Sequence, residues 1–132
     1  MGTNILTGPY NGSKLHDAYQ RALTSNDSNF VLFTDFEIYQ PAENEPTAWI
    51  VAPVIANGRA TGVLALQFPA SKINRLMTFE KRWEAVGMGR TGESYLAGPD
   101  GLMRSDSRLF LENPQSYKRD VVAAGTPADV AD

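Results

Sequence analysis

The spacing of three glycines, Gly87, Gly89 and Gly92, matches the glycine pattern of a dinucleotide-binding turn. That turn needs a buried strand before the glycines and a helix after them, because the helix N-terminus faces the pyrophosphate. Here the order is reversed, since residues 70–86 carry apolar side chains at helical spacing and residues 93–97 have the composition of a strand. The sequence therefore favours structural glycines, one ending a helix and two in a turn, over a nucleotide site.

Side chains suited to acid–base or covalent catalysis are few. The single histidine, His16, stands beside Asp17 in a helical pattern, and residues 105–107 lack the strand–turn–helix context of a hydrolase nucleophile. The chain has no cysteine, no phosphate-binding lysine motif and no clustered set of metal ligands. We therefore expect no catalytic residue, no cofactor, no metal site and no enzymatic activity. Two carboxylate pairs have the i, i+2 spacing of a solvated strand or loop: Asp35 with Glu37, and Glu43 with Glu45.

Composition narrows the class of protein further. The 132 residues suffice for one folded domain, and 42% hydrophobic with 20% charged residues is ordinary for a globular chain. The net charge of −3 gives no basic footprint, so we expect no nucleic-acid partner. No apolar run approaches the roughly 20 residues that span a bilayer, and the first residues lack the pattern of a signal peptide. The chain as given is expected to be soluble.

The first elements predicted along the chain are a helix and a strand. Ser13 is a suitable N-cap for a helix over residues 14–23, which carries an apolar stripe at helical spacing. Residues 29–41 are rich in β-forming residues and predict a strand. The polar loop 40–47 contains two prolines, which end this strand.

A β-hairpin is the clearest element of the sequence. It is predicted over residues 48–55 and 60–68, because Asn57 and Gly58 between them suit the positive φ angles of a tight turn. Pro53 in the first strand cannot donate to the ladder, which predicts a free edge or a bulge at that position.

The second half of the chain predicts two helices and another hairpin. The helices cover residues 70–86 and 115–124. The hairpin joins residues 94–98 and 102–107 through Pro99-Asp100-Gly101, where proline presets φ and glycine takes the positive angle. Together the elements give five strands, mostly antiparallel and linked by hairpins, with helices around them, which is an α+β fold.

Three segments carry a resemblance to a known family: GTNILTGPYNGSKL (2–15), PVIANGRATGVLALQ (53–67) and TGESYLAGPDGLMRSDSR (91–108). They resemble the double Cache (PAS-like) extracytoplasmic sensors of bacterial receptors, and the resemblance covers nearly the whole chain. Such sensors occur on chemoreceptors, membrane-bound adenylate or guanylate cyclases and sensor kinases. The resemblance implies a signal-transduction role, such as in chemotaxis, for a soluble fragment of a membrane-anchored protein, located in the periplasm or at the cell surface. A cyclase or kinase domain would lie outside this chain.

The resemblance also implies a division of the chain. Residues 1–86 correspond to a helix, three strands and the following helix of the first Cache module, and residues 87–132 to the hairpin and tail that open the second. In such sensors a long helix and two strands precede the first of these segments. Because a PAS-like sheet has five antiparallel strands, we expect the hairpin at 94–107 to supply the missing pair, either within the chain, as in a circular permutation, or across a swapped dimer.

A ligand pocket is implied between one sheet face and the helix and loops that cover it. Asp35, Tyr39 and Trp49 flank the 40–47 loop and are the candidate ligand-binding residues. Asp35 could anchor an ammonium group, and Tyr39 and Trp49 could wall an apolar or cationic ligand. Alternatively, the two aromatic residues only pack in the core or at its rim. The Arg and aromatic pair with which some of these sensors bind amino acids is not found in the sequence.

Arg104 and Asp106 are two further candidates. Their i, i+2 spacing places both on one face of a strand, where they can form an ion pair, and Arg108 beyond them could contact a ligand or another domain. Two functions stay open for the chain. The first is a sensing domain for an unknown small molecule, and the second is a ligand-free structural or dimerisation spacer, as part of a homodimer. A bound small molecule would favour the first, and a sheet face filled by Trp49, Phe33 and Phe36 would favour the second.

Overall fold

The computed structural model describes residues 4–131. The chain forms two compact units, which divide between Ala70 and Ser71. The resemblance places a module boundary at residue 86, and the assignment of the two units to sensor modules stays a prediction. Gly2 and Thr3, the first residues of the amino-terminal segment of that resemblance, lie outside the described residues.

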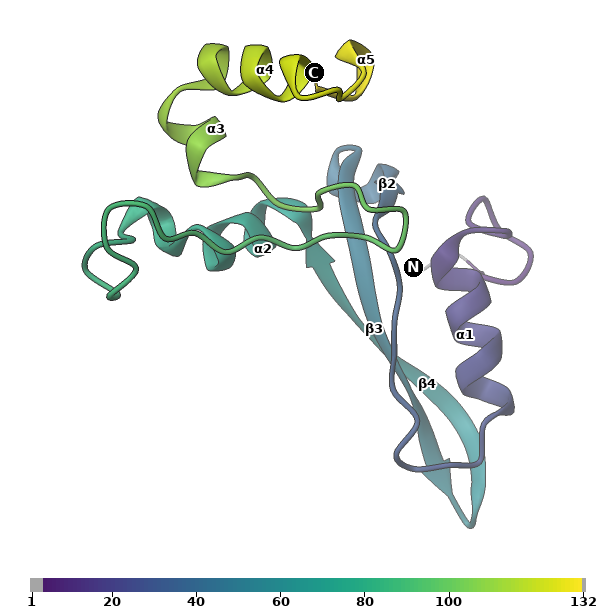
Figure 1. Ribbon diagram of the computed structural model, residues 1–132. Helices are drawn as coiled ribbons and strands as arrows, with labels where there is room; N and C mark the ends of the chain where they lie inside the picture. The colour runs from purple at the N-terminus through teal and green to yellow at the C-terminus, as the bar shows by residue number, and fades with distance from the viewer. Residues whose placement is uncertain (1–3, 132) are drawn as a thin grey trace. The chain divides into compact units, whose positions relative to one another are not determined.

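The first unit is an antiparallel sheet with one helix packed on it (Figure 1). Strand β3 (Glu45–Ala56) is central and pairs along one edge with β4 (Arg59–Pro69). Two short strands, β1 (Leu32–Phe33) and β2 (Glu37–Tyr39), pair in succession with its other edge. A 3-10 turn, η1 (Gln40–Ala42), follows β2. The predicted α+β class with an antiparallel sheet is confirmed.

The predicted strand over residues 29–41 is interrupted, because side chains take over its hydrogen bonds near Thr34. The Thr34 amide donates to the carbonyl of Trp49 at 2.9 Å, but the Trp49 amide donates to the Thr34 hydroxyl at 3.0 Å. The next residue, Asp35, accepts from the amide of Phe36 at 2.8 Å. Side-chain bonds of this kind compete with the backbone ladder and separate β1 from β2.

The predicted hairpin is confirmed, and so are its turn and the free edge or bulge predicted near Pro53. Asn57 and Gly58 have φ angles of 52° and 74° between β3 and β4. The register of β3 against β4 shifts between Val54 and Ile55, directly after Pro53, and the pairing of β1 with β3 ends at Val51. In the part of the chain that the structure describes, β4 pairs with β3 alone, so its outer edge is unpaired.

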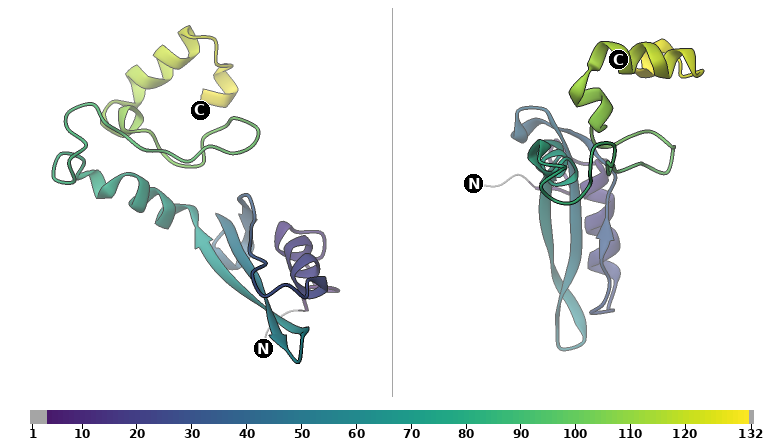
Figure 2. Two further views of the ribbon diagram at one scale, coloured as in Figure 1. Left: turned by 60° about the horizontal axis from the view of Figure 1, so that its bottom comes forward. Right: turned by 60° about the vertical axis from the view of Figure 1, so that its left-hand side comes forward.

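Helix α1 (Lys14–Thr24) covers one face of the sheet (Figures 1 and 2). Its N-cap is Ser13, whose hydroxyl accepts from the His16 amide at 3.1 Å, as the sequence predicts. The apolar stripe of the helix packs against two buried residues of β3, and these five side chains form the core: Leu15, Ala18, Ala22, Trp49 and Val51.

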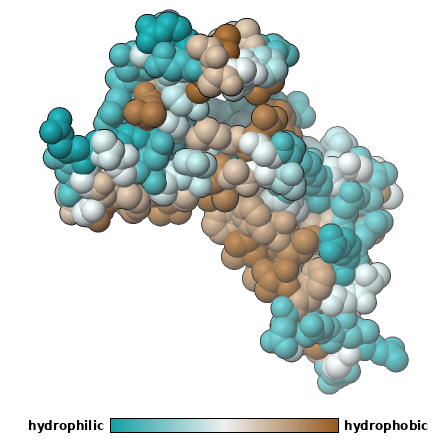
Figure 3. All heavy atoms as spheres, in the orientation of Figure 1, coloured by the Kyte–Doolittle hydropathy of each residue, from teal (hydrophilic) through white to brown (hydrophobic). Residues whose placement is uncertain are grey.

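The opposite face of the sheet carries exposed apolar side chains. Cross-strand pairs of Ile50 with Leu66 and of Phe33 with Ile50 place these residues away from the Trp49 face. Figure 3 shows apolar side chains gathered over β3 and β4. We call this surface the open sheet face; its members exposed by between 46% and 54% are Phe33, Val54, Leu64 and Leu66.

The second unit is built from short helices and turns. Helix α2 (Ala70–Met77) begins at the last residue of the first unit and leads into the 3-10 turn η2 (Phe79–Lys81). Three more helices follow: α3 (Arg108–Glu112), α4 (Pro114–Ala123) and α5 (Ala128–Ala131). Helix α4 confirms the short helix predicted at 115–124.

The prediction of one helix over residues 70–86 is wrong beyond Met77. Both the amide and the hydroxyl of Thr78 donate to the Asn74 carbonyl, at 2.9 and 2.7 Å, and the Ser94 hydroxyl donates to the Met77 carbonyl at 2.8 Å. The Thr78 amide bond is the last of the helical ladder, whereas the Met77 carbonyl, which would accept from the Lys81 amide in a continued helix, accepts from Ser94 instead. The three residues of η2, Phe79 to Lys81, then take left-handed φ angles of 51°, 55° and 64°.

The hairpin at 94–107 forms but does not contribute strands to the sheet. Its turn is as predicted, since the Gly101 amide donates to the Gly98 carbonyl at 3.0 Å and Gly101 has a φ of 80°. Beyond the turn the pairing amounts to one bridge, between Ala97 and Met103. The Ser105 hydroxyl, in place of a carbonyl, accepts from the Leu96 amide at 2.8 Å, which ends the ladder. The expectation that this hairpin completes the sheet within the chain is therefore wrong, and the swapped-dimer form stays a prediction.

The glycines with dinucleotide-like spacing are structural. Gly87 has a φ of 84° and closes a turn by donating to the Glu84 carbonyl at 3.1 Å. A Cβ at Gly92 would stand 2.2 Å from the Met88 carbonyl oxygen. Only glycine fits that turn, which explains the pattern without a nucleotide.

Candidate ligand-binding site

A carboxylate from the sheet holds the N-terminus of α1. Glu37 accepts from the amides of Lys14 and Leu15, at 2.9 and 3.2 Å. The first amides of a helix have no intrahelical acceptor, and their dipole favours a negative charge. Glu37 therefore fixes the start of α1 against β2, although the sequence suggests only a solvated carboxylate at this position.

Asp35 lies beside the same helix end. Lys14 Nζ stands 3.4 Å from Asp35 Oδ2 and also donates to the Phe36 carbonyl at 3.2 Å. The side chains of Asp35 and Lys14 are 27% and 45% exposed, so solvent reaches this ion pair. A ligand ammonium group could therefore approach the carboxylate only in competition with Lys14.

Three aromatic rings meet on the sheet face under α1. Tyr39 contacts Trp49 edge to face, with ring centroids 5.2 Å apart and planes at 90°, and Tyr10 lies 5.3 Å from Tyr39. Such edge-to-face pairs contribute about 0.5–1.5 kcal/mol beyond their area. Burial raises the pKa of Tyr39, and the neighbouring Tyr10 raises it further, so the phenol stays a neutral donor. The structure thus brings together two of the predicted site residues and adds Tyr10.

The indole nitrogen of Trp49 is buried and has no hydrogen-bond partner among the described residues. Trp49 is only 7% exposed, whereas Phe33 is 46% exposed on the open sheet face. A buried donor without an acceptor is costly, by about 1–3 kcal/mol. The sheet face under α1 is thus partly filled by Trp49, and it offers one unused N–H group.

Arg104 and Asp106 lie in the second unit with different principal partners. Arg104 Nη2 is 2.8 Å from Asp100 Oδ2, across the Pro-Asp-Gly turn, and its guanidinium occupies the space that a Cβ on Gly98 would need. The pKa of the Asp100 carboxyl is lowered by its hydrogen bond from Arg104. This ion pair closes the turn.

Asp106 is held by Asn74 on α2. The Asn74 side chain donates to Asp106 Oδ2 at 3.1 Å and accepts from the Asp106 amide at 2.7 Å. Asp106 also lines a cavity of about 330 Å³. The two bonds position the return strand of the hairpin against α2, which is a structural role.

Arg108 is the centre of the second unit. It is 7% exposed, and its Nη1 donates to the carbonyls of Gly89 and Gly92 at 2.9 and 3.1 Å. Its Nε donates to Glu112 at 2.7 Å, and its guanidinium lies 4.8 Å from the centre of the Trp83 ring. These contacts hold Nε and Nη1 of the guanidinium inside the unit, which gives this residue a structural role.

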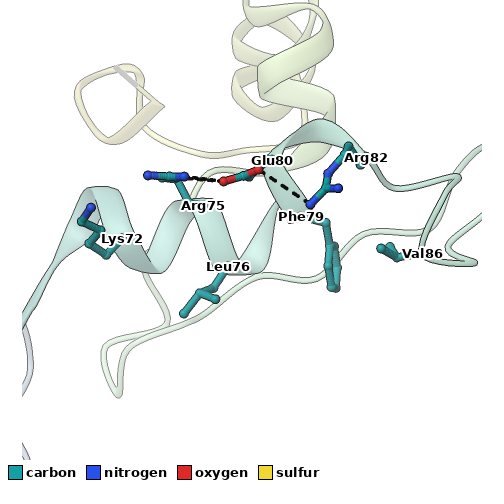
Figure 4. A pocket seen from close by; sticks show the side chains of 7 residues that line it. All are labelled: Lys72, Arg75, Leu76, Phe79, Glu80, Arg82 and Val86. Carbon is teal, nitrogen blue, oxygen red and sulfur yellow. Dashed lines mark hydrogen bonds and ion pairs between the residues drawn. The ribbon is translucent and has the colours of Figure 1, made fainter.

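A larger hollow lies along α2 and the kink after it (Figure 4). Its volume is about 450 Å³. An ion-paired row of Arg75, Glu80 and Arg82 runs along one side, and Leu76 and Phe79 point to the other (Figure 4). We call it the α2 hollow; it is lined by Lys72, Arg75, Leu76, Phe79, Glu80, Arg82 and Val86.

The fold resembles that of a chemoreceptor sensory domain. The sensory domain of the Campylobacter jejuni chemoreceptor Tlp3 (CcmL) is 18% identical, with a TM-score of 0.50 over 88% of this chain and 42% of that one. The ligand-binding domain of the same chemoreceptor in complex with L-norvaline is also 18% identical, with a TM-score of 0.49 and the same coverage. The chain thus spans less than half the length of these solved domains. No protein-family model matches the sequence, and no curated protein is significantly similar to it.

Residues 4–131 contain neither a metal-binding cluster nor a membrane-spanning helix. No group of three or more His, Cys, Asp or Glu side chains there is arranged to hold a metal ion. None of the helices in that range combines the length and the apolar composition needed to cross a membrane.

Sequence reasoning missed Tyr10, Lys14 and Glu37 near the predicted site. Their contacts join residues 21 to 29 positions apart, and no local pattern shows them. One signal was present: Tyr10 immediately precedes the predicted N-cap region, so folding of α1 onto the sheet brings it toward the loop 40–47.

Proposed function

We propose that this chain is part of a small-molecule-sensing domain of a bacterial signalling receptor, on the outer side of the cytoplasmic membrane. The observation that carries the proposal is the likeness of its fold to the sensory domain of a chemoreceptor. The double Cache resemblance of its hairpins and the absence of a catalytic constellation in the sequence support the same function. Membrane anchoring and any output domain would belong to parts of the receptor outside this chain.

The proposed ligand site lies where α1, β2 and β3 meet. Asp35 supplies a partly exposed carboxylate, and Tyr39 and Trp49 supply apolar walls. The unused Trp49 N–H offers a donor to a ligand oxygen. A small molecule with an ammonium group and an acceptor oxygen fits these groups best, because it would pair with Asp35 and satisfy the indole. Arg104 and Asp106, with Asp100 and Asn74 as their partners, are not assigned to this site.

The alternative is a spacer or dimerisation module without a ligand. The open sheet face favours it, since Val54, Leu64 and Leu66 expose apolar surface beside the unpaired edge of β4. Exposed apolar patches next to an open edge invite another chain. In this alternative the aromatic cluster around Trp49 is ordinary core.

A thermal-shift screen of the purified chain tests the proposal. The panel contains amino acids, amines, small carboxylates, sugars and nucleotides. A ligand at 100 times its dissociation constant stabilises the folded state by about 2.7 kcal/mol. The proposal predicts a hit that weakens in Asp35→Asn but not in Asp129→Asn, a carboxylate in α5.

Two outcomes would favour the alternative. One is a blank screen on a chain that unfolds cooperatively and sediments as a dimer. The other is a hit that Asp35→Asn and Asp129→Asn leave equally strong, because such a ligand would bind elsewhere.

A further inference from the structure

The α2 hollow is a candidate site in the second unit that the proposed function does not use. Its volume of about 450 Å³ lies within the roughly 300–1,000 Å³ typical of small-molecule pockets. All of its lining residues belong to the second unit. An inference about it is therefore independent of the site at Asp35, Tyr39 and Trp49.

The kink after Met77 creates the hollow. In a continuous helix, Phe79 and Glu80 would follow the spiral of α2, but the left-handed angles at residues 79–81 turn the chain. Figure 4 shows the result: Phe79 and Leu76 point to one side of α2, and Glu80 lies between Arg75 and Arg82 on the other. Leu76 and Val86 are 67% and 48% exposed, so the apolar side of the hollow is accessible.

The charges around the hollow do not balance. Three cations, Lys72, Arg75 and Arg82, stand against one carboxylate, Glu80. Arg75 Nε donates to Glu80 at 3.1 Å, whereas Arg82 lies 3.7 Å from it, beyond hydrogen-bond distance. Lys72 makes no recorded ion pair within the described part of the chain. Glu80 thus neutralises only one of the three cations, and an additional anion can pair with Lys72, or with Arg82, whose contact with Glu80 is the longer of the two.

We propose that the α2 hollow binds a small carboxylate with a compact apolar body, such as an aromatic acid. The excess positive charge that Lys72 and Arg82 bring to opposite ends of the hollow attracts the carboxylate, and the body covers Leu76, Phe79 and Val86. Charge complementarity selects the anion, and the exposed apolar side chains select the body over a bare ion. Arg75 stays paired with Glu80 and frames the hollow.

Phenylacetate is a suitable probe, with phenylacetamide as its neutral counterpart of similar size and inorganic phosphate as an anion without an apolar body. Each is titrated into the full chain, and the backbone amide resonances are followed by NMR. Phenylacetate is expected to shift the amide resonances of residues 72–86. Added salt should weaken its binding, because salt screens the charge attraction. Phenylacetamide and phosphate are each expected to bind at least several-fold more weakly.

Variants locate the binding. Lys72→Gln and Arg82→Gln should each lower the affinity for phenylacetate by up to roughly fivefold, as expected for an exposed charge pair. Leu76→Ser should also weaken it, and the 67% exposure of Leu76 makes this variant safe for folding. The matched control is Arg119→Gln, an exposed cation of α4.

Several results would overturn the proposal. If phenylacetamide binds as tightly as phenylacetate, charge does not select the ligand. If phosphate binds as tightly as phenylacetate, the apolar side chains do not select it. If phenylacetate at millimolar concentration leaves the amide resonances of residues 72–86 unchanged, the hollow is not a binding site. Because Asp35→Asn lies in the other unit, phenylacetate binding that survives this change separates the two proposals.

Discussion

The guanidinium of Arg108 lies 4.8 Å from the centre of the Trp83 ring, and both residues are buried, at 7% and 6% exposure. The same guanidinium bonds to the carbonyls of Gly89 and Gly92 and to Glu112. One planar cation thus joins a helix, two glycine turns and an aromatic ring. The order of the second unit depends on this geometry, which a lysine cannot reproduce.

Replacing Arg108 by lysine should therefore be destabilising even though the charge is kept. We expect Arg108→Lys to lower the free energy of unfolding by about 2 kcal/mol, through loss of charge-assisted hydrogen bonds and of the stacked ring contact. Urea denaturation followed by tryptophan fluorescence measures it. Arg119→Lys, at a 74% exposed side chain, is the control and should change little. Equal effects of the two changes would contradict the account.

The bond from Glu37 to α1 predicts a cap effect from a residue outside the helix. Glu37→Ala should cost about 1 kcal/mol, the usual value of a lost N-terminal cap, because two amides of α1 lose their acceptor. Glu84→Ala, an exposed carboxylate in a turn, serves as control. Thermal melts monitored by circular dichroism at 222 nm compare the two, and an unchanged melting temperature in Glu37→Ala would rule out the cap.

The β3–β4 hairpin has one glycine in its turn and one in β4, and alanine should affect the two differently. Gly58 has a φ of 74°, so Gly58→Ala should cost about 1–2 kcal/mol. At Gly62 a new Cβ would meet only the Val54 Cβ, at 4.0 Å, which is an ordinary contact. Gly62→Ala should therefore be neutral or slightly stabilising. Chemical denaturation of both variants tests the turn, and the reverse order would contradict the assigned φ angles.

The carboxyls of Glu80 and Asp100 provide a prediction about pH. Hydrogen bonds from Arg75 and Arg104, respectively, lower the two pKa values below their ordinary range. A carboxyl whose pKa is lowered by folding contributes stability above its unfolded pKa and loses it as the pH falls through the folded pKa. NMR titration of side-chain carbons should show each group titrating at a lower pH than the same residue type in an unstructured peptide. Arg75→Gln should raise the pKa of Glu80 and leave that of Asp100 unchanged.

Local rules account for much of the first unit. Ser13 at the start of α1 and Asn57-Gly58 between β3 and β4 have side chains or φ preferences that decide their conformation with few distant contacts. Pro53 fits β3 because its missing amide lies on the edge that β1 no longer pairs, beyond Val51. Tyr39 and Trp49, which flank the loop 40–47 in the sequence, come into contact because β2 and β3 pair across that short loop.

Long-range contacts decide what the sequence could not predict. The helical pattern over 70–86 is overruled where Ser94, 17 residues beyond Met77, bonds to the last carbonyl of α2. The roles of Arg108 and Glu37 depend on partners 15 to 23 positions away. The periodicity of the sequence does not reveal such pairs. From local patterns alone, Glu37 is therefore expected to face solvent, and Arg108 to contact a ligand or another domain.

A ligand site beside Trp49 can be tested with the two indole N–H resonances of the chain. The indole N–H of Trp49 has no acceptor among residues 4–131, and Trp83, equally buried in the second unit, is an internal control. A ligand from the thermal-shift screen is titrated into 15N-labelled protein, and Trp49→Phe assigns the signals. If the ligand binds beside Trp49, the Trp49 indole resonance shifts in proportion to the fraction of ligand bound, while that of Trp83 stays in place. A saturating ligand that leaves the Trp49 resonance unmoved, or that moves only Trp83, would contradict it.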